Sequence, residues 1–111
     1  MSVLGELQPN KVFKYFEEIC SIPHGSRNLQ QISDYLVDFA KAHELKYRQD
    51  EDLNVIIWKD GSKGYEASEP VILQGHMDMV AVKEADCDKD MEKEGLDLEI
   101  NGDYISAKEL L

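Results

Sequence analysis

Apolar residues recur at helical spacing along the first 43 positions and predict two helices. The first is expected to run from Pro9, which suits an initial helical turn, to about Cys20. The second is expected from a cap at Asn28 to about His43. The apolar faces consist of Val12, Phe13, Phe16, Ile19 and Cys20 in the first helix and of Leu29, Ile32, Leu36, Phe39 and Ala40 in the second. Charged residues lie opposite the second stripe, so this helix is expected to pack on a sheet.

Shorter apolar runs predict β-strands further along the chain. Residues 45–49 and 53–58 are expected to form two strands, and Asn101-Gly102 predicts a hairpin between residues 98–100 and 104–106. Residues 71–73, Val-Ile-Leu, follow a proline and lack polar alternation, which predicts a strand buried on both faces. The expected fold class is therefore α/β, with two helices packed on a mixed sheet of roughly five or six strands.

Candidate chemistry follows the predicted buried strand at His76 and Asp78. Active sites of such sheets lie at the carboxyl ends of strands. Two residues at this spacing share a face but are about 6.6 Å apart along the strand. This separation is large for two short side chains that would both bind one ion directly. The spacing suits His76 as a metal ligand and Asp78 as the carboxylate that orients its ring. A structural, hydrogen-bonded histidine is the alternative, because a catalytic zinc needs three protein ligands.

The segment Gln74-Gly75-His76-Met77-Asp78-Met79-Val80 occurs in a fixed order with other motifs, at residues 12–19, 22–26, 32–40, 54–57 and 101–108. In this order the motifs closely resemble the aminoacyl-histidine dipeptidases, also called Xaa-His dipeptidases or peptidase D, which are di-zinc metallopeptidases. The resemblance implies two zinc ions in the intact enzyme, with His76 binding one of them and Asp78 behind it. It also implies dipeptide substrates with carboxyl-terminal histidine.

The chain departs from the family after Ser106-Ala107-Lys108. Relatives continue with Gly-Thr-Thr-Leu-Gly-Ala-Asp, whose aspartate bridges the metals, whereas this chain reads Glu109-Leu110-Leu111. The resemblance implies that residues 1–111 are the amino-terminal part of a zinc-peptidase catalytic domain, with the lid domain and the remaining catalytic segments absent. Such a chain is expected to hold at most a partial zinc site and to be inactive alone.

An alternative function is a noncatalytic acidic binding or assembly module that keeps the peptidase half-fold. It would self-associate through an exposed sheet edge, since uncovered edges are prone to pairing.

Composition and charge limit the partners. The net charge of −11 and a pI near 4.5 oppose binding to nucleic acid or to anionic membranes, which requires clusters of lysine and arginine. No apolar run approaches the roughly 18 residues that span a bilayer, and the first residues lack the features of a secretion signal. The cytoplasm is therefore the expected location. The resemblance, and not the composition, implies a dipeptide as the partner of the intact enzyme.

The remaining candidates are assigned local roles. Cys20 is expected in the core and Cys87 in solvent, with no disulfide framework. His24 is expected to bond within a turn, and His43 to favour the end of a helix. Asp86-x-Asp88-x-Asp90 has the spacing of the first ligands of a calcium loop, but methionine occupies the sixth position, where that loop requires glycine. A solvated connection is the favoured interpretation of this acidic stretch.

Overall fold

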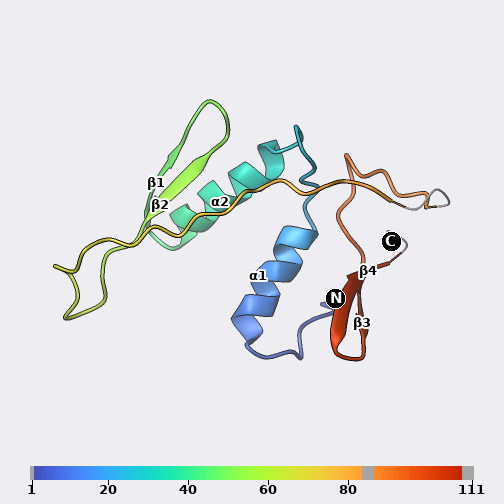
Figure 1. Ribbon diagram of the computed structural model, residues 1–111, viewed down its shortest axis with the longest axis horizontal. Coiled ribbons are helices and arrows are strands. Elements are labelled where there is room, and N and C mark those ends of the chain that lie inside the picture. The colour runs from blue at the N-terminus through green and yellow to red at the C-terminus, as the bar shows by residue number, and fades with distance from the viewer. Residues whose placement is uncertain (1, 84–86, 109–111) are drawn as a thin grey trace. The chain divides into compact units, whose positions relative to one another are not determined.

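A computed structural model describes residues 2–83 and 87–108. The described elements are α1 (Asn10–Cys20), α2 (Gln30–Ala42), β1 (Lys46–Gln49), β2 (Val55–Trp58), β3 (Leu98–Asn101) and β4 (Tyr104–Ala107), shown in Figure 1. The α/β class and both predicted helices are confirmed. Contacts divide the chain into two compact units, one formed by residues 1–32 with 78–111 and the other by Ser33–Met77.

In the first unit, α1 and the β3–β4 hairpin share a small core. Leu4, Cys20 and Leu98 are its buried members, and Leu4 is only 1% exposed. The backbone N–H of Leu96 donates a 2.8 Å hydrogen bond to the carbonyl of Cys20, which ties the entry of β3 to the end of α1. The prediction that Cys20 is a core residue is confirmed.

The β3–β4 hairpin is also confirmed. Its strands are antiparallel, and the pair nearest the turn is Asn101 with Tyr104, so Asn101 belongs to β3 and the loop is Gly102-Asp103. Gly102 has a φ of 60°, which is the left-handed conformation that a two-residue hairpin loop with glycine in its first position requires.

In the Ser33–Met77 unit, α2 carries the buried residues Ser33, Val37 and Ala40. The Ser33 hydroxyl donates to the carbonyl of Leu53 at 2.7 Å and accepts from the Gln49 amide at 2.8 Å. These bonds connect α2 to β1 and to the loop before β2; both strands were predicted, and they pair as an antiparallel hairpin. Figure 1 shows this hairpin beside α2.

The predicted buried strand at Val71, Ile72 and Leu73 is wrong for the described structure. These residues belong to no strand, and their exposed fractions are 83%, 89% and 92%. The described strands form two separate two-stranded antiparallel sheets instead of one mixed sheet. The physical reason is that a buried strand needs neighbours at both edges and covering layers, and an apolar run specifies a preference for burial without specifying those partners.

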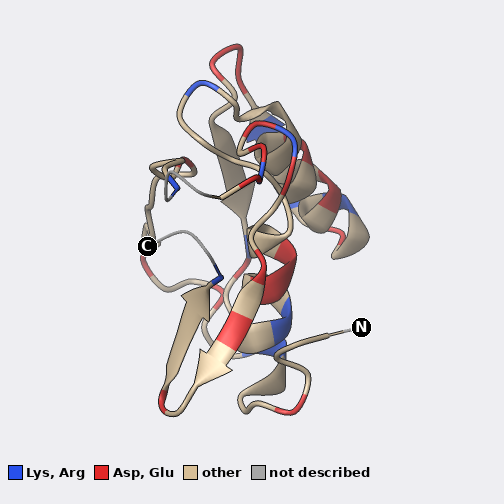
Figure 2. Cartoon of the chain, turned by 90° about the vertical axis from the view of Figure 1, so that its right-hand side faces the viewer, with Lys and Arg blue, Asp and Glu red and all other residues tan. Residues whose placement is uncertain are grey.

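The charge is distributed along the whole chain. Acidic residues occur in both helices, in β3 and in the connections (Figure 2), in agreement with the net charge of −11. None of the helices within residues 2–83 and 87–108 has the length and apolar character to cross a membrane.

Candidate functional site

The turn at residues 24–28 is fixed against the segment that carries Asp78. The backbone N–H of Met79 donates to the carbonyl of His24 at 3.0 Å, and Gly25 forms an isolated parallel bridge with Met79. The two backbones approach so closely that a Cβ at Gly25 would lie 2.8 Å from the Cβ of Ala81. The turn and this segment therefore form one braced structure within the first unit.

Asp78, the predicted orienting carboxylate, lies beside this turn. Its side chain is half-buried, and its Oδ2 accepts a 2.6 Å hydrogen bond from the hydroxyl of Ser26. The sequence did not predict that Ser26 contacts Asp78, because 52 positions separate the two residues. The only local signal was the Pro-His-Gly-Ser turn in which Ser26 stands.

His76, the predicted metal ligand, is exposed and belongs to the Ser33–Met77 unit. Asp78 belongs to the other unit, so the pairing of the two side chains stays a prediction. Within the described part of the chain, no group of three or more His, Cys, Asp or Glu side chains could hold a metal ion. His76 has the right chemistry for zinc, but the described residues alone do not fit a complete zinc site.

The other histidines have the local roles predicted for them. The ring Nδ1 of His24 lies 2.6 Å from the carbonyl of Ile22, inside the turn. The ring Nδ1 of His43 lies 2.9 Å from the carbonyl of Phe39 at the end of α2, and the two rings stack at 4.1 Å.

A groove of about 900 Å³ lies between the turn at residues 24–28 and the described part of the acidic stretch before β3, residues 87–97, which we call the acidic connection. One wall contains Gly25, Ser26, Arg27 and Asn28, and the other contains residues 88–93. The Asn28 side-chain amide donates to the carbonyl of Glu92 at 3.0 Å and so joins the two walls. The groove brings the hydroxyl that binds Asp78 next to a space large enough for a small molecule.

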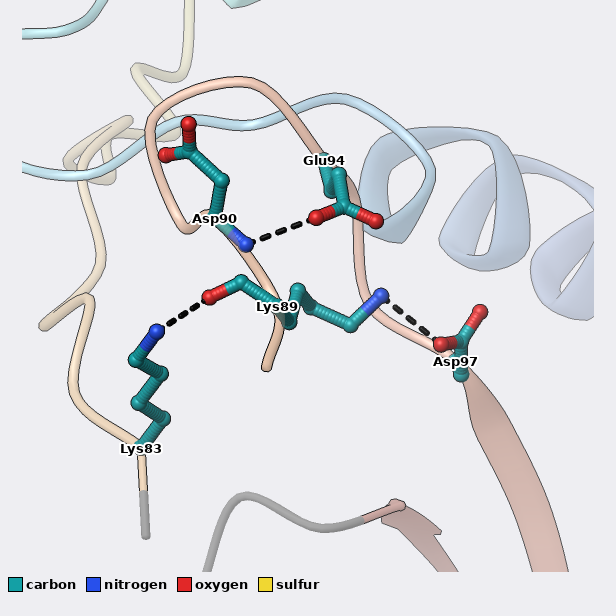
Figure 3. A network of polar contacts seen from close by, with 5 residues as sticks. All are labelled: Lys83, Lys89, Asp90, Glu94 and Asp97. Carbon is teal, nitrogen blue, oxygen red and sulfur yellow. Dashed lines mark hydrogen bonds and ion pairs between the residues drawn. The ribbon is translucent and has the colours of Figure 1, made fainter. Parts of the chain in front are cut away.

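The acidic connection is braced by its own polar contacts (Figure 3). The Lys89 ammonium pairs with Asp97 at 2.7 Å, and this hydrogen bond raises the pKa of Lys89. The backbone N–H of Asp90 donates to Glu94 at 2.6 Å, and the Lys83 ammonium donates to the carbonyl of Lys89.

One expectation about this connection is wrong, and part of another lies outside the described residues. Cys87 is 6% exposed, so its predicted exposure is wrong: charged neighbours in the sequence do not determine whether a small apolar thiol is buried. Asp86 of the calcium-like spacing lies outside the described residues, as do Glu109, Leu110 and Leu111, where the chain departs from the family.

The sequence and the backbone of the chain were compared with those of known proteins, and both are similar to one class of enzyme. The chain resembles the amino-terminal part of dipeptidases, as its motifs predicted. No protein-family model matches it.

Two particular relatives carry this conclusion. The chain is 36% identical over 108 residues to the cytosol non-specific dipeptidase of Escherichia coli (strain K12), which covers 97% of this chain and 22% of that protein. It superimposes with a TM-score of 0.90 and 34% identity on the crystal structure of aminoacylhistidine dipeptidase from Vibrio alginolyticus, over 96% of this chain and 22% of that one. The chain thus spans about a fifth of the length of the relatives it matches.

Proposed function

We propose that this chain supplies the amino-terminal part of the catalytic domain of a zinc-dependent dipeptidase. The observation that carries the proposal is the similarity over nearly the whole chain to two dipeptidases, at 36% and 34% identity and with a TM-score of 0.90 for the second. The name of the second relative supports Xaa-His dipeptides as the substrates and partners of the intact enzyme. The name of the Escherichia coli relative supports a cytoplasmic location.

In this proposal His76 binds zinc and Asp78 fixes its ring. A neutral imidazole binds zinc through one nitrogen, and a carboxylate that accepts a hydrogen bond from the other ring N–H sets the tautomer and makes the liganding nitrogen more basic. Zinc, when bound, polarises the scissile carbonyl and lowers the pKa of a bound water. The chain spans 22% of each relative, and the resemblance puts the other zinc ligands in later segments, so we propose that residues 1–111 alone are inactive.

A chimera tests this proposal. The chain would replace the segment of the Escherichia coli dipeptidase with which it aligns, and dipeptide hydrolysis and zinc content would be measured. We expect an active chimera that binds zinc. His76→Ala should reduce kcat/KM by more than about 100-fold and Asp78→Asn by about 10- to 100-fold, the usual effect of removing a partner of a zinc-bound histidine.

His43→Ala is the matched control, because it removes an imidazole whose ring bonds to the carbonyl of Phe39 and stacks on its ring, and which is not assigned to the candidate site. It should leave zinc content and kcat/KM close to those of the parent chimera. Full activity in the His76→Ala chimera would contradict the assignment of this residue, and an inactive but folded parent chimera would contradict the proposed function as a whole.

One observation favours a second candidate, the assembly module. Val71, Ile72 and Leu73 form a contiguous apolar segment that is 83–92% exposed, and an uncovered segment with high β-propensity is suited to pairing with a second copy. In this case the chain would act as an acidic, noncatalytic module whose partner is itself.

A further inference from the structure

We infer that Ser26 is a positioning residue for Asp78, holding its carboxylate in one rotamer. The inference rests on the proposed function, because it gives the second partner of a carboxylate that is assigned to orient a zinc-binding histidine. It assigns a role to a residue that stands in the motif at residues 22–26 and to which the sequence analysis gave no function.

The geometry of the contact supports this role. The Ser26 hydroxyl lies 2.6 Å from Oδ2 of Asp78, within the short range typical of a hydroxyl that donates to a charged carboxylate. An ionised carboxylate accepts at about four lone-pair sites, so one hydroxyl donor leaves acceptor capacity for an imidazole N–H. Ser26 can therefore fix the direction of Asp78 without using up its hydrogen-bonding capacity.

Ser26 is itself held in place by its turn. The N–H of Asn28 donates to the carbonyl of Gly25 at 2.9 Å, which closes the turn around Ser26. Met79, directly after Asp78, donates to the carbonyl of His24 at 3.0 Å. The donor and the acceptor of the side-chain bond thus stand on two backbones that are already tied together, so the bond costs little additional ordering.

The role is separable from folding. Ser26 is exposed, and the core residues Leu4, Cys20 and Leu98 belong to the α1–hairpin cluster. Removing an exposed hydroxyl opens no cavity, and its effect on stability is expected to be small. A change in Asp78 can therefore be measured in a protein that remains folded.

The experiment measures the χ1 rotamer of Asp78 by side-chain NMR coupling constants in this chain and in three variants. We expect one rotamer in the parent, rotamer averaging in Ser26→Ala, and a single rotamer again in Ser26→Thr, which keeps the hydroxyl. Ser21→Ala is the matched control, because it removes a serine hydroxyl that also makes a 2.6 Å bond, to the carbonyl of Glu18; it should leave Asp78 unchanged. A single Asp78 rotamer in Ser26→Ala, or averaging in the parent, overturns the inference.

A zinc titration separates this inference from the proposed function. The ring signals of His76 would be followed as zinc is added to the chimera described above, carrying in turn each of the same four sequences. If Ser26 acts through Asp78, Ser26→Ala should weaken the zinc response of His76 by about tenfold, while Ser26→Thr and Ser21→Ala should match the parent. A parent chimera whose His76 does not respond to zinc would count against the proposed zinc role, whereas the rotamers of Asp78 decide the role of Ser26 independently.

Discussion

Gly25 is the residue at which the fixed turn is most sensitive to substitution. Gly25→Ala would place its Cβ 2.8 Å from the Cβ of Ala81, so one of the two backbones must shift. Overpacking of this kind costs about 1–3 kcal/mol, and the hydrogen bond from Met79 to His24 should open more often. We expect amide hydrogen exchange of Met79 to accelerate by about tenfold or more.

Gly75→Ala is the matched control for this prediction, since no atom lies within 4 Å of a Cβ built there. It should leave the exchange of the Met79 amide unchanged. Equal exchange rates in Gly25→Ala and the parent would show that the turn is not held as closely as the structure describes.

Local chemistry predicted some individual residues well and others not at all. His24 and His43 bond to carbonyls two and four residues away, so a turn and a helix end were enough to predict their roles. The hydrogen bond from Ser26 to Asp78 joins residues 52 positions apart, and no local sequence pattern predicts it. Cys87 was placed in solvent because its neighbours are charged, but burial depends on how the connection folds and not on the neighbours' polarity. His76 and Asp78 as a metal-binding pair stay a prediction.

At the scale of elements, the amino-terminal segment is attached to α1 through one carboxylate. Glu17 accepts hydrogen bonds from the Ser2 hydroxyl at 2.6 Å and from the N–H groups of Val3 and Leu4 at 2.7 and 3.2 Å. The Ser2 hydroxyl is the largest cause of a pKa of Glu17 below its usual 4.5, and the two N–H groups add to it. The attachment brings Leu4 into the core.

This lowered pKa predicts a pH dependence. Because the pKa of Glu17 is lower in the folded chain than in the unfolded chain, the stabilisation is complete above about pH 4.5 and is lost as the pH falls through the lowered value. Below that value the protection factors of the Val3 and Leu4 amides, which are the exchange rates of an unfolded chain at the same pH divided by the observed rates, should fall about two- to tenfold, as expected for the loss of a hydrogen bond of ordinary net strength. Exchange measured by NMR across this pH range checks the prediction.

In Glu17→Gln, the protection factors of the Val3 and Leu4 amides should already be lower at neutral pH. They should not fall further on acidification. Glu6→Gln, at an exposed position of the same segment, serves as the control and should keep the parent's pH profile. A protection factor of the Leu4 amide that does not fall below the lowered pKa of Glu17 in the parent chain would contradict the attachment.

The elements themselves could be predicted where their signals are local. The apolar stripes and Pro9 placed α1 and α2 within about two residues, and the hairpin signal placed β3 and β4, because caps, turns and helical faces are set by neighbouring residues. The segment Val71-Ile72-Leu73 has an equally clear pattern, yet it is exposed. Its predicted burial depended on strands and covering layers that are distant in sequence, and a local apolar pattern does not show whether they are present.

At the scale of the whole molecule, two opposing terms govern self-association. The exposed segment at residues 71–73 favours pairing of two copies, since burying an isoleucine side chain contributes about 1.5–3 kcal/mol. The net charge of −11 on each copy opposes pairing, and salt screens that repulsion over about 8–10 Å at physiological ionic strength. If the chain is an assembly module, its association should therefore strengthen as salt is added.

Sedimentation equilibrium at low and high salt checks this prediction with two lysine variants of equal charge. Ile72→Lys should weaken association by about tenfold or more, because a lysine in a pairing strand loses the burial of isoleucine and blocks edge contact. Val12→Lys makes the same change in net charge at a 60% exposed position of α1, so it should associate at least as strongly as the parent. If both variants weakened association equally, the contact would not involve residues 71–73. A parent that stays monomeric at every salt concentration would remove the assembly module and leave the dipeptidase as the single candidate function.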